Sequence, residues 1–419
     1  MRVAIIGAGF TGLTAAYELL KKGYEVTVFE KDSLPGGLAI GYKEKGWEWT
    51  LEAFYHHWFT NDKAVLDLAK ELKYPVLIRH PKTSSLIDGE IFQLDSPKTF
   101  LTFPKLSLID RVRMAATLGL LRYNPLWKPL EKVTAEKILP KAMGNKAYTM
   151  LWEPLLVNKF GSFAKDISLA WFWARVTKRT PSLAYPEGGF LRFVETLAAV
   201  VEKKGGEIIY NADIKSLDEK QDSVSVNNQP FDKVIVTLPS FAFLRLAPKL
   251  PQSYQKKLMK LQGIGAVVLV MRLTKPFFTD NTYWLNVCDT KAPVLAIVEH
   301  TNFMNKKNYH NEHLVYLGNY LPKEHRYFSL NAEELLKEFD PYLRKINPHY
   351  KNSFIGIKKF SVPFAQPIIP INYSKDIPPF DTPLPHVYLA NMQQVYPWDR
   401  GTNYAVELGE KIANYISRE

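Results

Sequence analysis

Three glycines near the start of the chain have a spacing that could bind a phosphorylated ligand. Gly7, Gly9 and Gly12 form the pattern G-x-G-x-x-G, in which backbone can approach a pyrophosphate closely. Gly7 permits a tight turn, Gly9 allows the close approach, and Gly12 lets a following helix pack on a strand. The N-terminus of that helix points its free N–H groups at the phosphates. We expect the whole turn to contact the ligand: Gly7, Ala8, Gly9, Phe10, Thr11 and Gly12.

The elements that must position this turn are visible on both sides of it. Residues 2–6 are an apolar run of strand type, and apolar residues recur at helical spacing from Leu13 to Leu20. A second strand-type run, residues 25–29, leads to Glu30, whose carboxylate can accept hydrogen bonds from ribose hydroxyls and would repel a 2′-phosphate. The order strand, glycine turn, helix, strand and acid predicts a Rossmann-like α/β domain for a dinucleotide other than NADP.

A second glycine pair, Gly36-Gly37, follows Glu30 and would let backbone pass closely over a ligand. With this pair the sequence resembles the flavin-dependent amine oxidase, protoporphyrinogen oxidase and phytoene desaturase superfamily, in which such a pair lies under FAD. The resemblance implies that FAD is the cofactor. It also implies FAD contacts from the residues around the pair: Lys31, Gly36, Gly37 and Leu38.

Three later segments extend the resemblance over the whole chain. The first is residues 185–214, similar to the family's re-entry into the FAD domain, in which the residue at Ile214 contacts adenine through its backbone. The second is residues 231–239, similar to the strand that returns toward the cofactor with Thr237 and Leu238. The third opens at residues 387–391 and ends in a helix whose N-terminus faces the N1–C2=O end of the flavin in the family. It implies contacts from Asn391, Arg400, Gly401, Thr402 and Asn403.

The chain departs from the family pattern in two places. Leu38 stands where the family often has Arg, and Asn391-Met392 stands where it often has Gly-Asp. The Asn391 side chain could still bond a phosphate or ribitol hydroxyl, and Arg400 could supply a cation to the pyrophosphate. The run Asn391-Met392-Gln393 is also similar to UDP-galactopyranose mutases, which use reduced FAD without net redox change.

Two absences guide the choice of reaction. Amine oxidases of the family usually carry a lysine on the strand that matches residues 265–273, and this chain has none there. The leading expectation is therefore an FAD-dependent oxidoreductase that removes hydride from a hydrophobic or anionic small molecule, as desaturases and porphyrinogen oxidases do. A non-redox flavoenzyme of mutase type is the alternative. Because no second G-x-G-x-x-G follows, O2 or a quinone is the expected electron acceptor rather than NAD(P)H.

His56 and His57 are the candidate catalytic residues. By family position, residues 53–57 pass close to the isoalloxazine ring, and a histidine there could donate or accept a proton. A structural role, with both rings bonded to backbone or flavin, is the other interpretation. No metal site is expected, because adjacent histidines point apart on a strand.

The net charge of +12 is unevenly spread: residues 98–179 contain 15 basic and 5 acidic residues. Such a patch suits an anionic membrane surface, a phosphorylated substrate or a nucleic acid, and nucleic acid is disfavoured because no recognised module accompanies it. Ser107 is a helix N-cap candidate, and after it Leu108, Ile109, Val112, Ala116 and Leu120 share one helical face. This face fits either a core helix with a basic surface or an interfacial helix that makes peripheral membrane contact.

The remaining expectations concern location and architecture. A single cysteine, Cys288, and the lack of a signal peptide or an apolar span of ~18 residues predict a cytoplasmic protein. Chain order predicts a discontinuous FAD-binding domain made of residues 1–85, 186–245 and 380–419. An α+β substrate domain would combine a helical part, 86–185, with a sheet part, 246–379. Its predicted strands are 266–273, 294–298, 313–319 and 354–360, with a proline-rich linker at 363–385.

Overall fold

The computed structural model describes residues 1–220 and 222–418, and its first layer is a five-stranded parallel sheet. The strand order is β10-β2-β1-β14-β20. The bounds are β1 (Arg2–Ile6), β2 (Glu25–Phe29), β10 (Glu207–Ile209), β14 (Lys233–Val236) and β20 (Val387–Leu389). Ile6 pairs with both Phe29 and Val236, so the carboxyl ends of the central strands meet at one edge. That edge is where open parallel sheets bind ligands.

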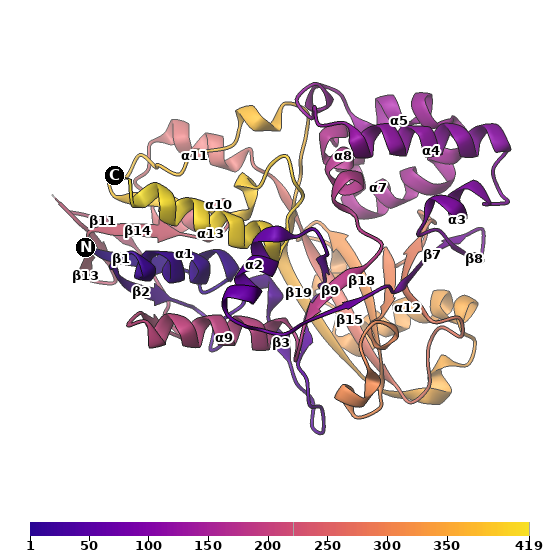
Figure 1. Ribbon diagram of the computed structural model, residues 1–419, viewed down its shortest axis with the longest axis horizontal. Coiled ribbons are helices and arrows are strands. Elements are labelled where there is room, and N and C mark those ends of the chain that lie inside the picture. The colour runs from indigo at the N-terminus through magenta and orange to yellow at the C-terminus, as the bar shows by residue number, and fades with distance from the viewer. Residues whose placement is uncertain (221, 419) are drawn as a thin grey trace.

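Three helices pack against this sheet: α1 (Phe10–Lys21), α9 (Phe190–Lys203) and α13 (Thr402–Ile416). Figure 1 shows α1 and α13 side by side although they lie at opposite ends of the chain. The mixed α/β fold and its parallel sheet confirm the predicted fold class. All five strands fall within residues 1–85, 186–245 and 380–419, and we retain the domain division as a proposal.

The second large sheet has seven strands in the order β19-β15-β18-β17-β16-β7-β8, and all neighbours are antiparallel except β16 and β7. The bounds are β7 (Lys82–Ile87), β8 (Glu90–Gln93), β15 (Gly263–Leu273), β16 (Thr282–Val287), β17 (Ala296–Glu299), β18 (His313–Leu321) and β19 (Phe354–Pro367). Helix α12 (Ala332–Ile346) covers it with buried Leu335, Phe339 and Leu343. The sequence analysis missed β7, β8 and β16, and β8 lies in the stretch predicted to be helical. Strand β19 runs into the predicted linker because its pairing with β15 continues as far as Pro367.

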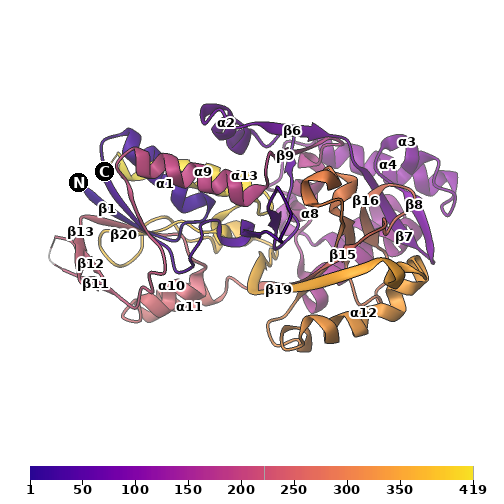
Figure 2. The ribbon, with the colours of Figure 1, turned by 90° about the horizontal axis from the view of Figure 1, so that it is seen from below.

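Helices form a separate part at one end of the second sheet, as Figures 1 and 2 show. They are α3 (Pro97–Leu101), α4 (Leu108–Tyr123), α5 (Ala135–Met143), α6 (Asn145–Ala147), α7 (Glu153–Phe160) and α8 (Leu169–Lys178). Ser107 caps α4 as predicted, accepting a hydrogen bond from the Asp110 N–H at 3.2 Å. The predicted apolar face of α4 is not in the core, however: Ile109 is 72% and Leu120 75% exposed. Core burial of that face is therefore wrong, because α4 packs through Met114 and Leu121 instead.

Shorter elements complete the fold. The remaining strands are β3 (Gly41–Tyr42), β4 (Leu51–Glu52), β5 (Trp58–Phe59), β6 (Val76–Arg79), β9 (Leu183–Pro186), β11 (Leu217–Glu219), β12 (Val224–Val226) and β13 (Gln229–Phe231). The remaining helices are α2 (Lys63–Glu71), α10 (Ser240–Leu246) and α11 (Gln252–Met259). Among the described residues, no helix has the length and apolar character needed to cross a bilayer.

Candidate active site

The glycine turn connects β1 to α1, and two of its glycines are required by the protein itself. Gly7 has a φ of +107°, which side chains rarely adopt, and a Cβ there would lie 2.5 Å from the Thr237 hydroxyl. A Cβ on Gly12 would lie 1.9 Å from the carbonyl oxygen of Gly7. Helix α1 can therefore begin this close to the strand only with glycine at position 12.

Gly9 is different, because nothing within the chain requires a glycine there. Its φ of −76° is ordinary, and an added Cβ would meet only the Cα of Gly37, at 4.0 Å. The second glycine pair lies against the turn, since the Gly36 N–H donates to the Ala8 carbonyl at 3.0 Å. Two backbone segments without side chains thus form an open cradle at the N-terminus of α1, the kind of site that binds a pyrophosphate. The cradle fits the diphosphate of FAD.

Glu30 lies beside this cradle at the end of β2. Its carboxylate is 9% exposed and accepts hydrogen bonds from the N–H groups of Ala8, at 2.7 Å, and Asp32, at 3.0 Å. The carbonyl of Glu30 accepts from the Ala212 N–H at 2.8 Å, which brings the segment leading to Ile214 to the same place. Lys31, next in the chain, is exposed. The predicted ribose and adenine contacts are therefore grouped at one end of the cradle.

Thr237 and Asn391 hold the carboxyl edge of the sheet together. The Thr237 hydroxyl donates to the Ile6 carbonyl at 2.8 Å. The buried Asn391 amide donates to the Leu238 carbonyl at 3.0 Å, and its oxygen accepts from the Gln393 N–H at 3.0 Å. These polar atoms thus have partners within the chain, and their contact with cofactor stays a prediction.

The start of α13 is fixed by two side chains that the resemblance assigned to the cofactor. Thr402 accepts a hydrogen bond from the Trp58 indole N–H at 2.7 Å, and the Asn403 side chain accepts from the Val65 N–H at 3.2 Å. Gly401 precedes them and is exposed. Thr402 and Asn403 therefore position the positive end of α13, whose N–H groups are suited to the negative charge of a reduced flavin.

Arg400 belongs to a buried ionic cluster between the helical part and the second sheet. Its guanidinium donates to the Gln366 side chain at 3.1 Å and to the Tyr320 hydroxyl. The centre of the cluster is the carboxylate of Asp399, 2.7 Å from the Arg175 guanidinium. Desolvation alone would raise the pKa of Asp399, but the neighbouring cations, Lys159 first among them, outweigh it and hold this pKa below its usual range.

Lys159 is the least satisfied member of this ionic cluster. Its ammonium is 3.9 Å from the Asp399 carboxylate, and in the described part of the chain it donates no hydrogen bond. It lies over the rings of Trp171 and Tyr320, at 5.2 and 5.0 Å from their centroids. Burial, with the nearby Arg175, holds the pKa of Lys159 well below its ordinary value. Lys159, Arg175 and Arg400 thus surround one carboxylate, and Arg175, with 42% of its side chain exposed, is the member that reaches solvent.

A small cavity of about 30 Å³ lies between Arg400 of this cluster and Leu38, the residue that follows the second glycine pair. Its wall is largely apolar, with one cationic end at Arg400. The lining residues are Leu38, Phe54, Tyr55, His56, Ala266, Val268, Asn319, Tyr320, Ala365 and Arg400. The Tyr55 ring packs against Gly318, where a Cβ would lie 2.6 Å from it. Residues distant in sequence therefore meet at a space that combines apolar walls with positive charge.

His56 and His57 both reach this region, and both are neutral at physiological pH. His56 Nδ1 lies 2.5 Å from the Phe54 carbonyl, so this nitrogen carries the proton. His57 Nδ1 is 3.3 Å from the Tyr283 hydroxyl. Burial lowers the pKa of His56 to about 4 and that of His57 to about 3. These rings are suited to orient neighbours through hydrogen bonds, and a catalytic role for either stays a prediction.

Glu52 is a buried carboxyl that the sequence did not single out. It accepts a hydrogen bond from the Tyr185 hydroxyl at 2.8 Å. It also accepts one, at 2.9 Å, from the N–H of Phe190, which is the first residue of α9. Burial raises the pKa of Glu52 to about 7. Glu52 thus anchors α9 to the short strand β4 next to residues 53–57.

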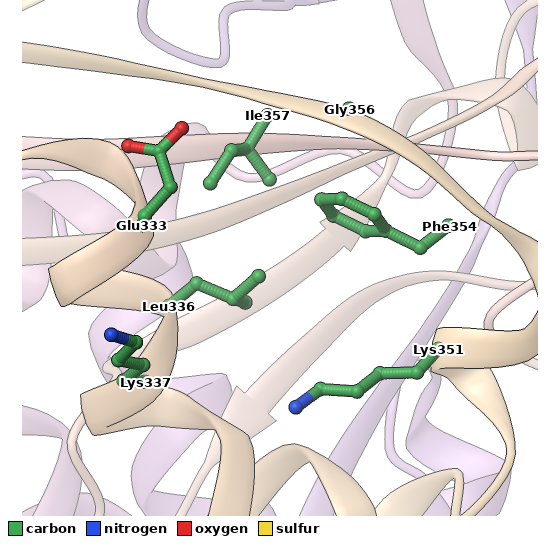
Figure 3. Close-up of a pocket in the computed structure, with 7 residues that line it drawn as sticks. All are labelled: Glu333, Leu336, Lys337, Lys351, Phe354, Gly356 and Ile357. Atoms are coloured by element: carbon green, nitrogen blue, oxygen red, sulfur yellow. The ribbon is translucent and has the colours of Figure 1, made fainter.

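A second cavity, of about 450 Å³, lies elsewhere, between α12 and the start of β19. Figure 3 shows the charged side chains of Glu333, Lys337 and Lys351 around Leu336, Phe354 and Ile357. It contains no histidine or cysteine and lies far from the glycine turn in Figure 1. Among the described residues, no three His, Cys, Asp or Glu side chains gather as a metal site.

Comparison with known proteins identifies the class of this chain. Residues 10–416 match the family described as flavin containing amine oxidoreductase, and the chain belongs to that family. It is a flavin-dependent oxidoreductase by class, with FAD as the cofactor, which confirms the resemblance read from the sequence. Short stretches also match curated proteins: 35 residues are 66% identical to a thiamine thiazole synthase of Thermotoga maritima, covering 8% of this chain and 14% of that protein. A stretch of 51 residues is 43% identical to a 4,4′-diapophytoene desaturase of Staphylococcus haemolyticus, covering 12% of this chain and 10% of that protein.

Solved structures share the fold over the whole chain at low sequence identity. A protoporphyrinogen oxidase homologue from Exiguobacterium sp. 255-15 is 16% identical with a TM-score of 0.75, covering 100% of this chain and 98% of its own. An oxidoreductase from Methanosarcina mazei is 18% identical with a TM-score of 0.76 and full coverage of both chains. A reduced UDP-galactopyranose mutase is 15% identical with a TM-score of 0.75, covering 100% of this chain and 95% of its own. These similarities establish the fold.

Proposed function

We propose that this protein uses FAD to remove a hydride from an amphiphilic substrate that has an apolar body and an anionic end, a reaction of the desaturase or porphyrinogen oxidase type. The observation that carries the proposal is the ionic cluster in which Lys159 and Arg400, with Arg175 at its solvent edge, surround the carboxylate of Asp399. FAD, when bound, supplies the hydride acceptor. The protein's residues supply the cradle, the apolar walls and the positive charge.

Charge balance supports an anionic ligand at the cluster. Arg175 reaches solvent, with 42% of its side chain exposed, so the enclosed groups are Lys159, Arg400 and the carboxylate of Asp399. When Lys159 is protonated, one enclosed positive charge has no counter-ion within the cluster, and such a charge is costly. The Lys159 ammonium has a proton-donating capacity that no described residue uses, so a carboxylate or phosphate oxygen of a ligand would complete it. The apolar side chains of Phe54, Ala266 and Val268 would contact the remainder of such a molecule.

Two probes, one anionic and one neutral, test this proposal. Oleate and oleyl alcohol share the apolar chain and differ in the charged end, and binding of each to oxidised holoenzyme can be followed through the visible flavin spectrum. We expect oleate to bind at least tenfold more tightly than the alcohol, and Lys159→Met to abolish the difference, since a hydrogen bond to a charged group contributes roughly 1.5–3 kcal/mol. Equal affinities in the unmodified protein would contradict the proposal.

A non-redox reaction on a nucleotide sugar is the second candidate. The structural similarity to a reduced UDP-galactopyranose mutase and the capacity of the same cations to hold a diphosphate favour it. The two candidates differ in electron balance. An oxidoreductase consumes one acceptor per turnover, whereas a mutase acts only after the flavin has been reduced and consumes none.

We further propose O2 or a quinone as electron acceptor and the cytoplasm as the place of action. The second motif that could bind a pyridine nucleotide is missing from the sequence, and the single cysteine, Cys288, has no partner for an internal disulfide. Anaerobic reduction followed by mixing with air or with a soluble quinone measures the two reoxidation rates directly. Rapid flavin reduction by NADH or NADPH would contradict this choice of acceptor.

A further inference from the structure

The outward side of helix α4 carries an unusual concentration of exposed apolar side chains. We define the α4 face as Leu108, Ile109, Val112, Leu120, Tyr123 and Leu126, which are 64%, 72%, 52%, 75%, 82% and 65% exposed. Large exposed apolar patches on soluble domains mark interaction surfaces. The α4 face is therefore a candidate interaction surface.

The members of the α4 face that lie on the helix are aligned along it. At 3.6 residues per turn, positions 108, 109, 112, 120 and 123 fall within an arc of roughly 120°. Met114 and Leu121, the residues through which α4 packs on its neighbours, lie on the other side. The alignment gives a continuous stripe along the 16 residues of α4.

Basic residues surround this stripe, and none of the acidic residues between positions 98 and 146 is fully exposed. Arg113 and Arg122 flank the arc on its two edges, and both are exposed. Further exposed lysines occur on α5 and on the segments that precede and follow α4 and α5: Lys98, Lys128, Lys132, Lys137, Lys141 and Lys146. The three acidic residues between positions 98 and 146 are all at least partly buried: Asp110, Glu131 and Glu136.

We propose that the α4 face docks this protein on the surface of an anionic membrane. An apolar stripe flanked by arginine and lysine is the composition of a helix that lies in the plane of the lipid headgroups. A second copy of the chain is a poorer partner, because a symmetric contact would place this basic surface against itself. The inference stands on surface residues alone and does not depend on the substrate.

The place of the α4 face in the fold gives docking a consequence for the active site. Arg122 donates hydrogen bonds to the carbonyls of Val176 and Arg179, at 3.2 and 2.9 Å, at the end of α8. The Trp173 indole, also on α8, donates to the Asn124 carbonyl at 2.8 Å. Helix α8 also carries Arg175 of the ionic cluster. When this protein is docked on the membrane, α8, which carries Arg175 of the ionic cluster, would thus be held next to the lipid surface.

Sedimentation of full-length holoprotein with vesicles tests the proposal. We expect binding at low salt to phosphatidylcholine vesicles with about 30% phosphatidylglycerol, and little to pure phosphatidylcholine. Ile109→Ser/Leu120→Ser should weaken it at least tenfold, because both side chains would lose their apolar contact. Arg113→Gln/Lys128→Gln/Lys132→Gln should weaken it about 100-fold, at roughly fivefold per charge, and reduce its salt dependence.

Matched variants on the FAD-binding side control for general effects. Phe241→Ser/Met259→Ser removes two exposed apolar residues, 42% and 60% exposed, and Lys256→Gln/Lys260→Gln removes two exposed charges. Both should bind vesicles as the unmodified protein does, and all variants should retain flavin.

Three results would overturn the proposal. The first is no vesicle binding by the unmodified protein at low salt. The second is equal binding to neutral and anionic vesicles. The third is a dimer in solution that Ile109→Ser/Leu120→Ser converts to a monomer while vesicle binding is unchanged, which would assign the α4 face to a second copy.

Discussion

Replacing Gly9 with valine should remove bound FAD and leave the fold intact. In the described structure a Cβ at this position meets only the Gly37 Cα, at 4.0 Å, and the backbone has an ordinary φ of −76°. We expect the free energy of unfolding of the Gly9→Val apoprotein to lie within about 1 kcal/mol of that of the unmodified apoprotein, because the substitution creates no clash. A side chain there would occupy the place of the pyrophosphate, so flavin would no longer be retained.

Gly12→Val is the matched contrast. Its Cβ would lie 1.9 Å from the Gly7 carbonyl oxygen, a backbone atom that cannot move without displacing β1 or α1. Such overpacking costs about 3 kcal/mol or more, so this variant should lose stability with or without flavin. Comparing the two variants distinguishes Gly9, where glycine is needed to bind the ligand, from Gly12, where glycine is needed for the fold.

Urea unfolding with and without added FAD measures both effects. At a free FAD concentration about 1,000 times its Kd, the unmodified protein should gain about 4 kcal/mol of unfolding free energy. Gly9→Val should gain none, and its purified form should lack the visible flavin spectrum. Full flavin occupancy in Gly9→Val would refute the cradle, and an apoprotein as unstable as Gly12→Val would refute the packing argument.

Three other predictions follow from buried titratable groups. Glu52, with its pKa raised by burial to about 7, keeps a proton that the unfolded chain releases near pH 4.5. Its contribution of about 3 kcal/mol to the unfolding free energy is therefore present below pH 4.5 and lost as pH rises to about 7. Urea unfolding at several pH values should show this slope, and Glu52→Gln should flatten it; an unchanged slope would contradict the assignment. His56 and His57 have pKa values of about 4 and 3, so neither ring should produce an inflection in the pH profile of kcat/KM between pH 5.5 and 8. An inflection in that range that His57→Gln removes would be evidence against neutral rings. Burial raises the pKa of Cys288 from its ordinary 9 to about 12. At pH 8, iodoacetamide should therefore label this thiol about 1,000-fold more slowly in the native protein than in urea, and mass spectrometry can follow both rates. Similar rates in the two states would show an accessible thiolate.

The glycine turn could be predicted from sequence because its requirements are local. A positive φ at Gly7 and a close helix start at Gly12 depend on residues within one strand, turn and helix, so the spacing alone indicates them. The family resemblance added the long-range return of residues 387–403 to the same edge of the sheet, where β20 pairs with β14.

The ionic cluster could not be predicted in this way. Lys159, Arg175 and Asp399 come from three segments, and only the packing of the helical part on the C-terminal segment brings them together. The sequence counted Lys159 and Arg175 as part of a surface charge excess. The burial of Lys159 and the position of Arg175 depend on contacts for which no periodicity gives a signal, such as the hydrogen bond from the Trp171 indole to Asp399 at 3.1 Å. The excess of basic residues in 98–179 could be counted from the sequence, but which of these residues are exposed and which are buried could not be predicted.

Helix α4 shows the same limit from the opposite side. Its sequence carries apolar residues on two faces of the helix, and periodicity cannot show which face is buried in the core. Met114 and Leu121 fill the gap against the neighbouring helices, so the larger stripe that contains Ile109 and Leu120 is left to water. Leaving it exposed costs about 25 cal/mol for each Å² of apolar surface, a cost removed only when something apolar covers the stripe. Arginines flank that stripe, and none of the acidic residues between positions 98 and 146 is fully exposed. The headgroup region of an anionic bilayer would match both the apolar residues and the positive charges, which is why we propose it as the partner.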